Sequence, residues 1–246
     1  MAAVVLVHSP LAGPACWGPV AAELERRGLD AVVPGIDPPE RTSPPWWPVA
    51  AGQVATALDQ ANRGDGPTGA TSDEVVLVGH SGAGPRLPAI ADRLLEPGWR
   101  TVAALFVDAG LPRPGVSPAD TLPPDLRAHL EQLTDGDGML PPWPQWWTAA
   151  TVAALVPDPT VRARVLGECR PVPRALFDEQ VPVPDEWPGR SACAYLSFTY
   201  EEEAAEADGR GWPVARMPGQ HLHPVVEPGG VADALMLLLG ALGIRP

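Results

Sequence analysis

Ser81 is the residue of this chain whose surroundings best suit a nucleophile. It follows the apolar run Val75-Val-Leu-Val-Gly-His80 and precedes Gly82-Ala-Gly84. Such a run predicts a buried strand that turns sharply into a helix, which is the setting of a nucleophile elbow. The small residues Gly79 and Ala83 stand two positions on either side of the serine, as a tight turn requires. A serine held there lies at a helix N-terminus, where backbone amides favour negative charge.

Other glycine-rich turns share this context, and a turn without any chemistry is one alternative. A phosphate-binding loop requires a lysine, and the sequence contains none. A dinucleotide-binding turn requires glycine at its first, third and sixth positions, but Ser81 occupies the third, between Gly79 and Gly84. We therefore favour a nucleophilic serine, which needs an adjacent base for activation.

The composition argues against several other classes of function. The formal net charge is −13, and all 17 basic residues are arginines that form no basic run. This argues against nucleic acid as a partner, and the absence of lysine excludes a lysine Schiff base. Cys16, Cys169 and Cys193 lack metal-type spacing and are expected to be free thiols in a reducing compartment. The bias toward Ala, Arg and Pro is typical of a GC-rich bacterial genome.

Short β-branched runs alternate with longer Ala- and Leu-rich helical patterns, which predicts a parallel sheet with helices on both faces. We expect one domain over residues 1–246. The expected strands are 3–7, 30–33, 74–78, 101–107, 192–198 and 212–217. The expected helices are 17–27, 49–62, one that follows Gly84 and runs through Leu95, 201–208 and 231–242. A surface loop is expected at 63–72, and residues 111–190 show helical patches at 124–133, 146–155 and 159–169 but no convincing strand.

Neither the apolar N-terminus nor 231–242 is long enough to cross a membrane, so we expect a cytoplasmic protein with no membrane partner.

Four segments, in this order, resemble the α/β-hydrolase superfamily, and within it small esterases of the salicylate-ester hydrolase and hydroxynitrile lyase type. They are Val4-Val-Leu-Val-His8 with Trp17-Gly-Pro-Val, then Val75 to Ser81, Leu105-Phe-Val-Asp-Ala-Gly-Leu-Pro112 and Pro218-Gly-Gln-His-Leu-His-Pro-Val-Val-Glu-Pro228. The resemblance implies a mostly parallel six-stranded sheet that lacks the family's first two strands. It also implies a helical cap at about residues 112–190 and a Ser-His-acid triad without cofactor or metal.

The resemblance points to His221 as the base, because it follows the last strand after Pro-Gly-Gln. His223 is the competitor, but counting back from Pro228 and Val231 favours His221. For the acid, the family usually has Gly-x-x-Asp after the strand that precedes the base, and this chain has Thr199-Tyr-Glu-Glu-Glu203 there instead. We prefer Asp108, since some family members place the acid one strand earlier, and keep Glu201 as the alternative.

The oxyanion hole departs from the family pattern. Gly82 can supply one backbone N–H, and the family takes a second from the loop after the first strand. There the family reads His-Gly-x, whereas this chain reads His8-Ser9-Pro10, and proline has no N–H. A second donor must then come from Ser9 or from Leu11, or the hole is incomplete.

Five tryptophans are expected on the carboxyl side of the sheet, where open α/β sheets bind ligands. They are Trp46, Trp47, Trp143, Trp146 and Trp147. They suggest a pocket for a hydrophobic small molecule, although each could instead attach a Pro-rich cap to the core. The sequence thus favours a serine hydrolase of an ester, lactone or thioester, and leaves a homodimer open. Two alternatives are a lyase, cyclase or isomerase of secondary metabolism that uses the same Ser/His pair, and a non-catalytic ligand-binding protein.

Overall fold

The structure is a computed structural model that describes residues 2–37, 44–63, 73–189 and 191–244. A six-stranded sheet forms its centre, and every neighbouring pair of strands is parallel. The strand order is β2-β1-β3-β4-β7-β8. The strands are β1 (Ala3–Val7), β2 (Ala31–Val32), β3 (Glu74–His80), β4 (Arg100–Val107), β7 (Ala192–Ser197) and β8 (Val214–Arg216). The predicted sheet is therefore confirmed, with β2 and β8 shorter than expected.

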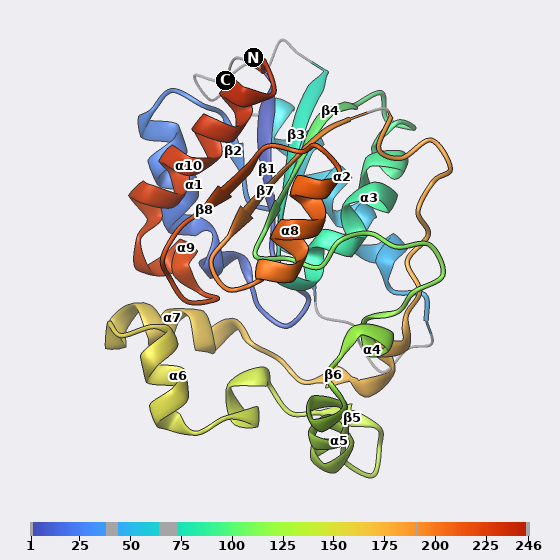
Figure 1. Cartoon of the computed structure of the whole chain (residues 1–246), viewed down its shortest axis with the longest axis vertical. Helices are drawn as coiled ribbons and strands as arrows, with labels where there is room; N and C mark the ends of the chain where they lie inside the picture. The colour runs from blue at the N-terminus through green and yellow to red at the C-terminus, as the bar shows by residue number, and fades with distance from the viewer. Residues whose placement is uncertain (1, 38–43, 64–72, 190, 245–246) are drawn as a thin grey trace.

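Helices cover both faces of the sheet because its strands are apolar on both sides. On one face α1 (Gly18–Arg26) and α10 (Pro228–Ala241) pack against alternate residues such as Val4, Leu6 and Val76. On the other face α2 (Trp47–Arg63), α3 (Leu87–Leu94) and α8 (Glu201–Gly209) cover the intervening residues, such as Val5 and Leu77. Figure 1 shows the two helical layers on either side of the strands.

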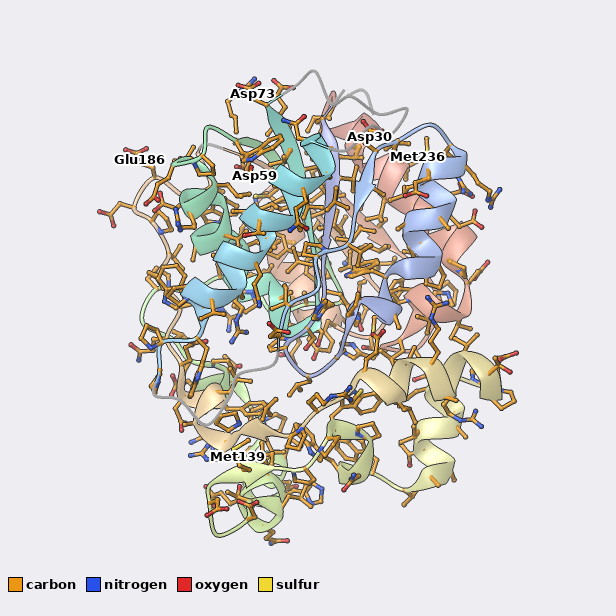
Figure 2. The ribbon with its side chains drawn as sticks, turned by 180° about the vertical axis from the view of Figure 1, so that it is seen from behind. Asp30, Asp59, Asp73, Met139, Glu186 and Met236 are labelled. Carbon is orange, nitrogen blue, oxygen red and sulfur yellow. The ribbon has the colours of Figure 1, made fainter. Side chains whose placement is uncertain are left out.

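Residues 112–189, here called the cap segment, lie between β4 and β7 and occupy one end of the molecule (Figure 1). Its helices are α4 (Pro118–Thr121), α5 (Pro124–Leu133), α6 (Ala149–Leu155) and α7 (Pro159–Glu168), with 3-10 turns η3 (Trp143–Trp146) and η4 (Arg174–Asp178). In Figure 2, Met139 marks this end, whereas Asp30 and Asp73 mark the amino ends of β2 and β3 at the opposite end. The cap segment therefore lies at the carboxyl ends of the strands.

The expectation of no strand in residues 111–190 is wrong in one place. Met139–Leu140 (β5) and Val172–Pro173 (β6) form a small antiparallel pair. Two-residue strands are too short to show an alternating pattern, so only the pairing of segments far apart in the chain reveals them. The expected loop at 63–72 lies almost wholly outside the described residues. No helix in the described part of the chain is long and apolar enough to cross a membrane.

Candidate active site

Ser81 stands at the turn between β3 and the 3-10 helix η2 (Ser81–Arg86). Its φ is 57°, a left-handed conformation that costs a non-glycine residue about 1–3 kcal/mol. The sharp turn at Ser81 is sterically possible because the neighbouring residues are small. A Cβ on Gly84 would lie 2.3 Å from the Gly110 carbonyl oxygen, so only glycine lets η2 pack this closely against the segment after β4. The strained serine and its close packing are the local geometry that the sequence predicts for a nucleophile elbow.

Ser81, His221 and Asp108 form one continuous hydrogen-bonded chain. His221 Nε2 lies 2.9 Å from Ser81 Oγ, and His221 Nδ1 lies 2.7 Å from Asp108 Oδ2. The carboxylate can only accept, so Nδ1–H donates to it and Nε2 is left free to accept the serine proton. The Asp108 side chain is fully buried, whereas 29% of the His221 side chain is exposed. Ser81 is half-buried. The Ser81 end of this hydrogen-bonded series is therefore accessible to solvent, whereas the Asp108 end is not.

The Asp108 carboxylate is surrounded by donors at the carboxyl end of β7. Oδ1 accepts the backbone N–H groups of Phe198, Thr199 and Tyr200 at 2.7–3.0 Å, and Oδ2 accepts the Thr199 hydroxyl at 2.7 Å. Burial alone would raise the pKa of Asp108, but the bonds from His221 and Thr199 outweigh it and hold the pKa well below its usual range. Asp108 is therefore an ionised carboxylate at neutral pH.

Tyr195 fixes the backbone on which Asp108 stands. Asp108 has a φ of 42°, the second left-handed non-glycine conformation in the described chain. The buried Tyr195 hydroxyl accepts the Ala109 N–H at 3.0 Å and donates to the Ala109 carbonyl at 2.7 Å. One hydroxyl thus satisfies both backbone groups of the residue that follows Asp108. Without it, both would be buried and unpaired.

Two aromatic rings lie close to the imidazole of His221. The His80 ring centroid is 4.7 Å away, and Tyr200 is stacked on it at 5.2 Å with an angle of 14° between the planes. His80 Nε2–H donates to the His221 carbonyl at 2.8 Å. Burial, and next the nearby His221, lower the pKa of His80 to about 3, so it is neutral at pH 7. These contacts restrain both the ring and the backbone of His221.

The two alternatives considered for the base and the acid lie elsewhere. His223 is buried, and its Nε2 lies 3.2 Å from Glu227 Oε2. Glu201 is the first residue of α8, 65% of its side chain is exposed, and it accepts from Arg216 Nε at 3.2 Å. Neither makes a hydrogen bond to the Ser81–His221–Asp108 chain among the described residues.

The loop after β1 brings Ser9 beside Gly82. A Cβ on Gly82 would lie 3.3 Å from Ser9 Oγ and 3.4 Å from Pro10 Cδ. The Leu11 N–H donates to Ser9 Oγ at 3.3 Å, and among the described residues no acceptor takes the Ser9 hydroxyl hydrogen. His8 holds the start of this loop, because Nε2 accepts the Ile36 N–H at 3.1 Å and Nδ1–H donates to the Ser9 carbonyl at 2.9 Å.

Most of the five tryptophans pack within the protein. Trp46 and Trp146 are buried in one apolar cluster with Leu130, Leu140, Val172 and Leu176, and Trp143 lies between this cluster and a second one. Trp47, the first residue of α2, is partly buried against the core. Trp147 is 44% exposed and lies beside the His129 ring. For Trp46 and Trp146 the structure favours the attachment of the cap segment over contact with a ligand.

Comparisons with known proteins identify the fold of this chain through solved structures alone. No protein-family model and no curated protein sequence matches it. Solved structures do match over nearly their whole length. An extracellular α/β-hydrolase from a Paenibacillus species, described as sharing structural and functional homology with tobacco salicylic acid binding protein 2, is 20% identical, with a TM-score of 0.74 over 97% of this chain and 99% of that one. This chain has the α/β-hydrolase fold. A pyrethroid hydrolase from Sphingobium faniae and tomato methylketone synthase I are also similar, with TM-scores of 0.69 and 0.67, identities of 18% and 17%, and coverage of 98% of both chains in each case.

Within the α/β-hydrolase fold, three residues that hold Asp108 in place were not among the candidates that the sequence offered. Tyr195 lies on β7, and Thr199 and Tyr200 lie just after it. In the sheet β7 is the neighbour of β4, which Asp108 directly follows. The signal was available, because polar side chains at the carboxyl ends of adjacent parallel strands meet at one edge of the sheet. Using it required knowing that β4 and β7 are adjacent although the cap segment separates them in the chain.

Proposed function

We propose that this protein is a serine hydrolase that acts on an ester, lactone or thioester of a hydrophobic small molecule. The observation that carries the proposal is the unbroken chain from Ser81 Oγ through His221 to the buried Asp108 carboxylate. A serine hydroxyl becomes nucleophilic only next to a base that is itself oriented by a third group, and this geometry meets that requirement.

In the proposed reaction, Ser81 Oγ attacks the substrate carbonyl while His221 Nε2 takes the hydroxyl proton. The buried Asp108 carboxylate stabilises the imidazolium that forms. As the tetrahedral intermediate collapses, His221 returns the proton to the leaving alcohol or thiol, and the acyl group stays on Ser81. Water then attacks the acyl-enzyme with His221 as base, which releases the acid and restores Ser81.

The negative charge on the intermediate needs two donors, and we assign them to the Gly82 N–H and the Ser9 hydroxyl. Pro10 cannot donate, and the Leu11 N–H is engaged by Ser9 Oγ. By accepting from Leu11, Ser9 is left with its hydrogen free to donate, and it stands next to Gly82. A hydroxyl would thus replace the backbone amide that the family uses.

The surroundings of the site favour an uncharged, apolar substrate. Leu11 and Trp143 pack against the apolar cluster of the cap segment, and Tyr200 stacks on His221. Arg86, the cation closest in sequence to the nucleophile, is buried and paired with Glu179. One structural neighbour is a pyrethroid hydrolase and another is a polyneuridine aldehyde esterase, which is consistent with an ester of a small organic molecule.

A fluorophosphonate probe tests the proposal, followed by mass spectrometry and p-nitrophenyl ester hydrolysis. We expect a single adduct on Ser81 and ester turnover that Ser81→Ala abolishes, with Ser117→Ala as the matched control. Labelling of Ser81 without turnover of any ester would favour acid–base chemistry without an acyl-enzyme. No labelling would favour a ligand-binding protein.

A further inference from the structure

Arg86 and Glu179 form an ion pair that is buried beside the nucleophile elbow. Arg86 is the last residue of η2, and Glu179 directly follows η4 in the cap segment. The two side chains are 8% and 2% exposed, and Arg86 Nη2 donates to Glu179 Oε2 at 2.8 Å. The pair is therefore shielded from water and tied to a fixed geometry on both sides.

The arginine reaches back to the residue after the nucleophile. Arg86 Nη1 donates to the Gly82 carbonyl at 2.8 Å. In a 3-10 helix that carbonyl would accept from the backbone N–H of residue 85, but residue 85 is proline and has no N–H. The guanidinium supplies the donor that Pro85 lacks.

The glutamate joins this contact to two other segments. Its Oε1 accepts the backbone N–H groups of Trp46 at 2.5 Å and Trp47 at 3.0 Å. Trp47 is the first residue of α2, so the carboxylate also stabilises the N-terminus of that helix. The elbow, the start of α2 and the cap segment therefore meet at one buried carboxylate.

We infer that Arg86 is a positioning residue for the oxyanion hole. Through Glu179, the position of Arg86 depends on how the cap segment packs against the core. Arg86 holds the carbonyl of Gly82, the residue whose N–H we assign to the oxyanion. A shift of Glu179 with the cap segment would release the Arg86 guanidinium. The peptide group of Gly82 would then be free to rotate. The inference rests on the proposed function and deepens it, because it links substrate enclosure to the stabilisation of the transition state.

The test compares two double variants that remove an Arg–Glu pair without leaving an unpaired buried charge. Arg86→Met with Glu179→Gln removes the buried pair, and the introduced amide oxygen can still accept from the backbone N–H groups of Trp46 and Trp47. Arg113→Met with Glu206→Gln is the control, because Arg113 and Glu206 also join the cap segment to the core, at α8, away from the elbow. Glu206 pairs with Arg210 as well, so this control removes at least as many ionic contacts of the core. The readouts are the maximal rate of fluorophosphonate labelling, the probe concentration at half that rate, and the urea midpoint.

We expect Arg86→Met with Glu179→Gln to lower the maximal labelling rate per folded molecule at least about tenfold, less than the roughly hundredfold loss when a donor is removed outright. The half-saturating probe concentration should change little, because the affected donor acts on charge that develops in the transition state. The control should stay within about twofold of wild type, as expected for a half-exposed pair.

A wild-type labelling rate in Arg86→Met with Glu179→Gln, whatever its urea midpoint, would overturn the inference and leave the proposed function intact. An equal loss in the control would also overturn it, because general loosening of the cap segment would then explain both. Wild-type protein that the probe does not label would overturn the proposed function, and the role of Arg86 with it.

Discussion

Asp108 and His221 are 113 positions apart in the chain, yet Asp108 Oδ2 lies 2.7 Å from His221 Nδ1. The contact joins the carboxyl end of β4 to the loop after β8, with β7 between the two strands in the sheet. Because Phe198, Thr199 and Tyr200 donate to the same carboxylate, the segment directly after β7 also holds Asp108 in place.

His221→Ala should lower ester turnover by about 10⁴-fold or more, since it removes the proposed general base. His223→Ala should keep most of the turnover per folded molecule, although its loss from a buried position should reduce stability. Steady-state kinetics, corrected by the urea unfolding curve of each variant, measures both effects. Equal losses of turnover in the two variants would contradict the assignment of the base.

Asp108→Asn should lower kcat by about 10⁴-fold, because an amide cannot stabilise the imidazolium and favours the wrong tautomer of His221. The change should also alter how stability depends on pH. The pKa of Asp108 is held below its usual value in the folded protein, so its stabilisation is fully present above the unfolded pKa of about 4 and is lost as the pH falls further.

The free energy of unfolding should therefore drop more steeply in wild type than in Asp108→Asn as the pH falls below about 4. Urea titrations at several pH values measure this difference. Glu201→Gln is the control, because that exposed side chain pairs with Arg216 on the surface and should leave both kcat and the pH profile near wild type. Parallel profiles in wild type and Asp108→Asn would refute the account of the buried carboxylate.

Ser9→Ala should lower kcat by about a hundredfold with little change in KM, as expected when one oxyanion donor is removed. Adding Pro10→Ala to this variant restores a backbone N–H at the position that the family uses, and should recover part of the loss. The kinetics of wild type, the single variant and the double variant on one ester decide the point. A Ser9→Ala variant with wild-type kcat would remove Ser9 from the oxyanion hole.

Tyr195→Phe should reduce the free energy of unfolding by about 1–3 kcal/mol for each backbone group of Ala109 that is left buried and unpaired. Because Ala109 follows the acid directly, kcat should fall as well, with an unchanged KM. Denaturant unfolding and ester kinetics give the two values. A variant as stable and as active as wild type would show that Tyr195 does not hold the turn at Asp108.

The order along the chain of the six strands of the main sheet, and the sharp turn at Ser81, could be predicted from the sequence alone. Val75 to His80 is an apolar run of strand length that ends in small residues, and such patterns act over a few neighbouring positions. For the acid, the sequence left two candidates, Asp108 and Glu201. Both stand at the carboxyl ends of strands, and a local pattern does not tell which of two strand ends faces His221.

Only the tertiary structure decided among such alternatives, because it sets distances between residues that are far apart in the chain. It placed Asp108 within hydrogen-bonding distance of His221 and turned Glu201 toward Arg216. In the folded chain, Arg86 donates to Glu179 although the two residues are 93 positions apart. The Leu11 N–H donates to Ser9 Oγ. Local sequence fixes the conformation of each turn, whereas the packing of strands β4, β7 and β8 and of the cap segment fixes which turns meet.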